Sequence, residues 1–236
     1  MKNFNNATNR ESAEERAYQS IIRLIINQQY PPGALLIEAQ ISKEIDMSRT
    51  PIRNALRRLC SDGFLDSSFN KSVRVPSLSS KDLQTLFELR LLLETKAAFE
   101  AAVNAKPHQK EEFDQIILKE KEGYYQGDPY LYKINEQIHF GIAALSQNIY
   151  LARAIKPLFW RSELYVFFFD SFYIGNEQKN LLRDPEKSVS HSEHCMLVDA
   201  IFQNDSKKAE EIMRQHILST KTMLTTNASI RFNKES

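Results

Sequence analysis

The sequence predicts a mainly α protein, with an N-terminal winged helix-turn-helix carrying a small two-stranded wing, followed by an all-α bundle of about six helices. Residues 37–45 and 48–60 are short amphipathic segments separated only by Asp46 and Met47, and two brief extended runs follow them. From Lys81 onward apolar residues recur at helical spacing, with short interruptions and no strand-like alternation.

These patterns divide the chain into four segments. Residues 1–11 are polar and rich in asparagine, which predicts a disordered tail. Residues 12–76 form the winged unit, residues 77–80 a serine-containing linker, and residues 81–230 the helical domain.

Composition narrows the class of protein. The chain has 236 residues, of which 42% are hydrophobic, enough for one large or two modest domains. Its net charge is +1, with a modest positive excess in the N-terminal third. Cys60 and Cys195 are isolated, as is usual in a reducing compartment. Without a signal-like start or a run of about 18 apolar residues, we expect a cytoplasmic protein with no membrane partner.

The segment at residues 48–60 has two contrasting faces. Arg49, Arg53 and Arg57 recur four residues apart on one face. The other face is apolar and contains Ile52, Ala55, Leu56 and Leu59. A guanidinium offers a rigid fork of donors that can hold phosphates or guanine edges, so the stripe fits a DNA recognition helix. The alternative is a solvated face of paired arginines, and the adjoining helix and wing favour DNA.

The two extended runs, residues 64–67 and 72–75, flank a polar tip at residues 68–71. Lys71 and Arg74 place positive charge on this hairpin. We therefore expect it to act as a wing beside the recognition helix.

A second candidate site lies in the helical domain. Asn135 and His139 are four residues apart on one helix, and His194 and His216 lie on the last two helices. Three imidazoles and an oxygen donor from adjacent helices could converge on a divalent metal. Histidines that simply pack in the core or face solvent are the ordinary alternative.

Two arginines, Arg90 and Arg161, lie on otherwise largely apolar helices. Either could bind a carboxylate effector through two hydrogen bonds, and either could be a structural arginine paired with an acid. The aromatic segment at residues 159–173 is expected to pack in the core, with a ligand-pocket wall or a dimer surface as alternatives.

Residues 32–38, 48–59 and 62–65 resemble the GntR family of bacterial transcriptional regulators. Residues 88–98 and 193–216 are similar to the branch of that family with a FadR C-terminal domain, abbreviated FCD. The resemblance implies a homodimeric, ligand-responsive regulator, more often a repressor, that binds a palindromic double-stranded DNA operator and is released by a small organic-acid effector. It also implies that the helical domain binds this effector and mediates dimerisation.

The resemblance further implies that Arg49 and Arg53 contact bases or their flanking phosphates. Ser48 and Thr50 would hydrogen-bond the DNA backbone, and the wing would lie along the minor groove. Ser72 departs from the family pattern, because a glycine usually stands at this position of the wing.

For the metal, the resemblance implies an Asp four residues before a His, and two later histidines. His139, His194 and His216 match, but Asn135 replaces the Asp. An amide oxygen can bind a metal but brings no negative charge, so zinc, nickel, manganese or iron would be held less strongly or not at all. The resemblance identifies a regulator and not an enzyme. The rival interpretation is a metal-dependent hydrolase or oxygenase with an accessory DNA-binding domain, although these helices show no evident nucleophile–base pair.

Overall fold

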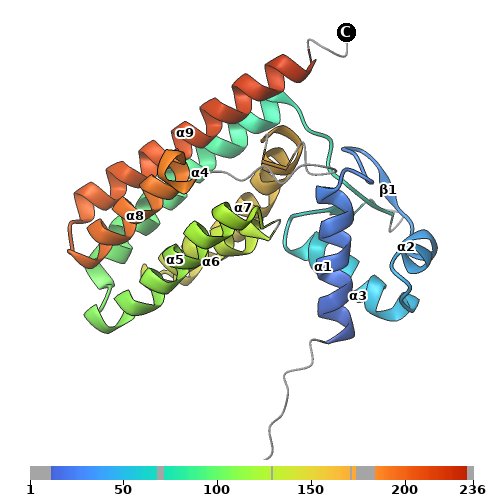
Figure 1. The fold of residues 1–236 in the computed structure, drawn as a ribbon, viewed down its shortest axis with the longest axis horizontal. Coiled ribbons are helices and arrows are strands. Elements are labelled where there is room, and N and C mark those ends of the chain that lie inside the picture. The colour runs from blue at the N-terminus through green and yellow to red at the C-terminus, as the bar shows by residue number, and fades with distance from the viewer. Residues whose placement is uncertain (1–11, 68–71, 129, 171, 174–183, 233–236) are drawn as a thin grey trace, which may run out of the picture. The chain divides into compact units, whose positions relative to one another are not determined.

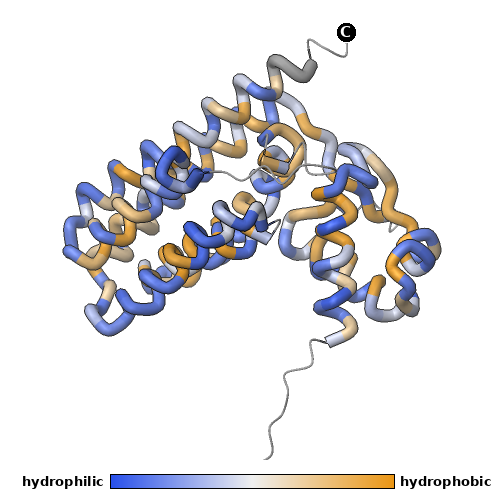
Figure 2. Tube along the Cα trace, viewed as in Figure 1, coloured by the Kyte–Doolittle hydropathy of each residue, from blue (hydrophilic) through white to orange (hydrophobic). Residues whose placement is uncertain are grey.

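The computed structural model describes residues 12–67, 72–128, 130–170, 172–173 and 184–232 (Figure 1). The chain divides into two compact units, Met1–Ser77 and Leu78–Ser236. In Figure 2 hydrophilic and hydrophobic residues alternate along the helices, as expected when each helix buries one face. No helix among the described residues combines the length and the apolar character needed to cross a membrane.

The first unit contains α1 (Ala13–Ile26), α2 (Glu38–Glu44) and α3 (Arg49–Ser61). The Ser12 hydroxyl accepts a hydrogen bond from the Glu15 amide and caps α1. Helix α1 packs against α3, and the apolar faces of both helices are buried. The predicted helix-turn-helix is therefore confirmed, with α3 in the place of the predicted recognition helix.

A small antiparallel sheet completes this unit. Its strands are β1 (Leu35–Leu36), β2 (Asp66–Ser67) and β3 (Val73–Arg74), in the order β1-β3-β2. Strands β2 and β3 are the predicted wing, whereas β1 was not predicted, because two residues are too few to show an alternating pattern. Gly63 follows α3 with a φ of 83°, which lets the chain turn from the helix into β2. The tip of the wing, with Lys71, lies outside the described residues.

The second unit has six α-helices in the part of the chain that is described, as the sequence predicted. They are α4 (Ser80–Asn104), α5 (Lys110–Gln126), α6 (Leu131–Leu145), α7 (Ile149–Phe169), α8 (Val189–Phe202) and α9 (Ser206–Phe232). Short 3-10 turns, Pro107–Gln109 and Pro185–Lys187, precede α5 and α8. Helices α4 and α9 run side by side (Figure 1), and α4 also packs against α6, α7 and α8.

Helix α7 supplies most of the aromatic core of this unit. The rings of Phe159 and Trp160 lie 5.9 Å apart edge to face, and the ring of Phe167 lies 5.6 Å from that of Tyr132 on α6. All four side chains are buried, so the aromatic segment packs in the core, as the sequence predicted. The Phe159 ring also lies 5.2 Å from that of His139, so the aromatic core of α7 borders the histidines.

Candidate functional site

The exposed face of α3 carries the residues predicted to touch DNA. Ser48 adopts the extended backbone of a helix N-cap, and its side chain makes no capping hydrogen bond. Ser48, Arg49 and Thr50 are exposed at the start of the helix, and Arg53 is exposed one turn later. Arg74 is exposed on β3. These side chains are thus available on the surface of the first unit.

Arg53 is held by an acid that the sequence did not single out. Its Nε and Nη2 donate to the two carboxylate oxygens of Glu38 over 2.9–3.1 Å. The hydrogen bond from Arg53 lowers the pKa of Glu38 below its usual value. Because the pair is exposed, it contributes little to stability. Arg53 can therefore exchange Glu38 for a phosphate or a base at small cost.

Arg58 lies on the opposite side of α3 and has a structural role. Its guanidinium lies 4.1 Å from the centre of the Tyr18 ring and donates to Glu15 over 2.7 Å. Both partners belong to α1, so Arg58 joins the two helices.

The three predicted histidines come together inside the second unit. His139 is on α6, His194 on α8 and His216 on α9, and all three are buried. One ring nitrogen of each lies within 4.8 Å of those of the other two. Three imidazoles at this spacing can share one metal ion.

A separate buried glutamate hydrogen-bonds the Nδ1 atom of each imidazole. The distances are 2.5 Å from His139 to Glu94, 2.7 Å from His194 to Glu120, and 3.0 Å from His216 to Glu193. A carboxylate that accepts from Nδ1–H leaves the lone pair on Nε2, which is how protein metal sites orient their histidines.

The remaining nitrogens fit a metal. Nε2 of His139 and Nε2 of His194 are buried and have no hydrogen-bond partner among the described residues. An unpartnered buried polar atom costs about 1–3 kcal/mol, so two of them side by side need an explanation. A divalent ion bound by the Nε2 atoms would supply the missing interaction.

The protonation of the cluster is also suitable for a metal. Burial lowers the pKa of His139 and, together with the neighbouring histidines, holds that of His216 well below the usual value. Burial would raise the pKa of Glu94, but Arg90 and His139 outweigh it and hold that pKa at about 2. At neutral pH His139 and His216 are therefore neutral imidazoles and Glu94 is an ionised carboxylate, the forms that a metal requires.

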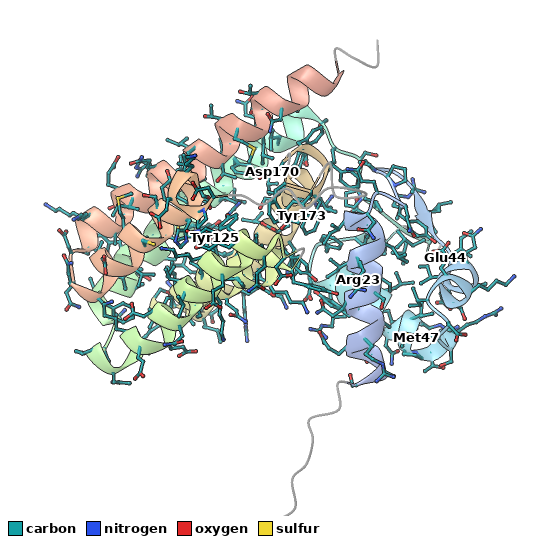
Figure 3. All side chains as sticks on the ribbon, in the orientation of Figure 1. Arg23, Glu44, Met47, Tyr125, Asp170 and Tyr173 are labelled. Carbon is teal, nitrogen blue, oxygen red and sulfur yellow. The ribbon has the colours of Figure 1, made fainter. Side chains whose placement is uncertain are left out.

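A cavity of about 370 Å³ adjoins the cluster. His139 and His216 line it, and Asp170 and Tyr173, labelled in Figure 3, line it near the C-terminal end of α7. Its size suits a small organic molecule.

The two predicted effector arginines differ in position. Arg90 lines the cavity, but its Nε contacts Glu94 at 2.5 Å and its Nη1 donates to Ser162 at 2.7 Å. Two of its five N–H donors are therefore already used. Arg161, on α7, is not among the residues that line the cavity.

Asn135, the fourth predicted ligand, also lines the cavity. Its Nδ2 donates to Oε1 of Glu163 on α7 over 3.0 Å. Glu163 is buried, and burial raises its pKa to about 8. Helices α6, α8 and α9 thus bring the three predicted histidines together, Asn135 lines the adjoining cavity, and glutamates that the sequence did not single out contact all four.

Comparison with known proteins identifies both units. Residues 13–75 match the family model of bacterial regulatory proteins of the gntR family, and residues 85–219 match that of the FCD domain. The solved structure of E. coli McbR/YncC superposes with a TM-score of 0.67 at 21% identity, covering 96% of this chain and 100% of that one. A putative GntR regulator from Rhodococcus sp. RHA1 has a TM-score of 0.65 at 17% identity, covering 92% and 99%. These likenesses show the same fold.

Curated relatives are transcriptional regulators. The Nta operon transcriptional regulator of Aminobacter aminovorans is 29% identical over 135 residues, which are 57% of this chain and 64% of that relative. A probable D-xylose utilization operon transcriptional repressor of Paenarthrobacter nicotinovorans is 27% identical over 202 residues, 84% of this chain and 82% of the relative. The chain therefore belongs to the FCD-containing branch of the gntR family, as a DNA-binding transcriptional regulator and not an enzyme.

Proposed function

We propose that this chain is a metal-containing repressor that binds a palindromic operator as a homodimer and leaves it when a small carboxylate effector enters the cavity. The observation that carries the proposal is the convergence of three buried imidazoles, two with unpartnered Nε2 atoms, beside a cavity of about 370 Å³. With a metal site and an adjoining cavity, the helical domain would bind a small molecule and control the DNA-binding unit.

His139, His194 and His216 would hold the ion through Nε2, and Asn135 would add an amide oxygen. Nitrogen and oxygen donors of this kind suit zinc, nickel, manganese or iron. When bound, the ion would supply a positive charge to which the carboxylate oxygens of an effector can coordinate. The effector would also meet Arg90, which lines the cavity and uses two of its five N–H donors for Glu94 and Ser162.

The proposed dimer is supported by an apolar stripe on α4. Leu92 and Val103 are 68% and 59% exposed, Leu89 is 43% exposed, and Phe99 lies half-buried between them. Their spacing of three, seven and four residues keeps them on one face of the helix. An apolar stripe on a surface helix favours pairing with a second copy, and a two-fold dimer presents two recognition helices to two half-sites.

Calorimetry with a panel of small mono- and dicarboxylic acids tests the effector part of the proposal. We expect at least one acid to bind zinc-loaded protein with measurable heat, and the same acid to bind chelator-treated protein at least tenfold more weakly. The panel should include neutral amides of the same acids as matched controls. If every acid gave no heat with loaded protein, or if the amides bound as well as the acids, the carboxylate effector would be wrong.

A further inference from the structure

Four buried glutamates surround the proposed metal ligands, one for each ligand. Glu94, Glu120 and Glu193 hydrogen-bond the three histidines, and each comes from a different helix, α4, α5 or α8. Glu163, on α7, makes the corresponding contact with Asn135. The exposed fractions are 2% for Glu94, 3% for Glu120, 2% for Glu163 and 1% for Glu193.

The contact with Glu163 determines the orientation of the Asn135 amide group. The hydrogen bond runs from Nδ2 of Asn135 to Oε1 of Glu163, so the NH₂ edge of the amide faces the carboxyl group. With Nδ2 engaged at 3.0 Å, Oδ1 lies on the other edge, and no described residue donates a hydrogen bond to it. The amide oxygen is therefore the atom left for a ligand.

The side chain of Glu163 makes few polar contacts in the described structure. Among the described residues its one hydrogen bond is the one from Asn135, although its side chain is almost fully buried. The carboxyl group of Glu163 is therefore directed at Asn135, which lines the cavity beside the histidines.

The ligands themselves carry no negative charge, since three imidazoles and one amide are all neutral. We propose that Glu163 is a positioning residue for the metal site: it holds Asn135 with Oδ1 free for the ion and places a carboxylate one hydrogen bond beyond the ligands. This inference rests on the proposed metal site. It explains how the amide of Asn135 is held with its oxygen turned away from Glu163.

Zinc affinity, measured by competition with a chromophoric chelator, tests this role in four proteins: wild type, Glu163→Gln, Asn135→Asp and the double variant. Loss of an outer carboxylate typically weakens metal binding about 10- to 100-fold. We expect Glu163→Gln to weaken zinc binding at least tenfold in the wild-type background. In the Asn135→Asp background the same change should cost nothing or tighten binding. The introduced carboxylate has two equivalent oxygens that need no orienting partner, and it would repel the carboxylate of Glu163.

Glu120→Gln is the matched control, because Glu120 is equally buried and orients His194 instead of Asn135. It should weaken zinc binding in both backgrounds. Unfolding temperatures of the metal-free proteins would confirm that each variant folds. Should Glu163→Gln not fold, Asn135→Ser tests the same contact from the side of the ligand, and it should weaken zinc binding because it removes the amide oxygen proposed to bind the ion.

The possible outcomes distinguish the proposed metal site from the proposed role of Glu163. If wild type binds zinc and Glu163→Gln binds it equally well, the role of Glu163 is wrong and the metal site stands. Equal losses from Glu163→Gln in both backgrounds would mean that Glu163 only joins α6 to α7. Unchanged affinity in Asn135→Ser would remove Asn135 from the site. If wild type bound no zinc, the metal site and this inference would both be wrong.

Discussion

Replacing His194 with alanine is expected to abolish stoichiometric metal binding and to remove the stabilisation that metal gives to the folded protein. Nε2 of His194 is buried and lacks a hydrogen-bond partner in the described part of the chain, and a ring nitrogen of His194 lies within 4.8 Å of those of His139 and His216. A ligand at a hundred times its dissociation constant stabilises a protein by about 2.7 kcal/mol. For a chain of this size, losing that amount lowers the unfolding temperature by roughly 5–10 °C.

Elemental analysis and thermal unfolding with and without zinc measure both effects. His191→Ala is the matched control, because His191 lies on the same helix and hydrogen-bonds the same glutamate, Glu120, over 2.8 Å. Its Nε2 lies 3.7 Å from the sulfur of Cys195. We expect His191→Ala to keep one equivalent of metal. Retention of metal by His194→Ala, or its equal loss from both variants, would contradict the proposed ligand set.

Replacing Arg49 with alanine is expected to weaken specific operator binding by at least tenfold. Arg49 is exposed in the first turn of α3, and no ion pair ties it to a described residue, in contrast to Arg53. A bidentate contact between arginine and guanine contributes about 1–3 kcal/mol of discrimination between bases. The loss should be larger for the operator than for random DNA, because phosphate contacts alone are insensitive to sequence.

Anisotropy titrations of labelled operator and random duplexes, each at several salt concentrations, would measure this difference. Arg23→Ala serves as the control, since Arg23 is exposed in the last turn of α1, away from the recognition helix in sequence (Figure 3). Its operator affinity should stay within about twofold of wild type, as is usual for a surface change. Equal affinities for Arg49→Ala and Arg23→Ala would mean that α3 does not read the operator.

Most of the fold was predictable because a helix produces a periodic pattern of apolar residues over many positions of the sequence. Their spacing alone predicts that Ile52 and Leu56 lie on the buried face of α3 and that Arg53 lies on its exposed face. Strand β1 was not predictable in the same way, since two residues show no period, and Leu35 pairs with Arg74 from a distant part of the chain.

The candidate site was predictable only in part. The histidines and Asn135 could be chosen by residue type, and the structure places the three histidines together. The four glutamates could not be predicted from the sequence, because each lies on a different helix from the ligand that it contacts. Glu163 gave one signal, as an acid within the aromatic run of α7. Sequence alone also could not separate Arg90, which lines the cavity, from Arg161, which does not.

The central claim is that α3 recognises an operator and that an acid bound in the helical domain releases it. The most direct measurement is selection of genomic fragments by zinc-loaded protein at near-physiological salt, with and without the acid found by calorimetry, and with Arg49→Ala in parallel. The account predicts that wild type alone enriches a short palindrome and that the acid abolishes the enrichment. Recovery of the same random fragments by both proteins, unaffected by the acid, would contradict it.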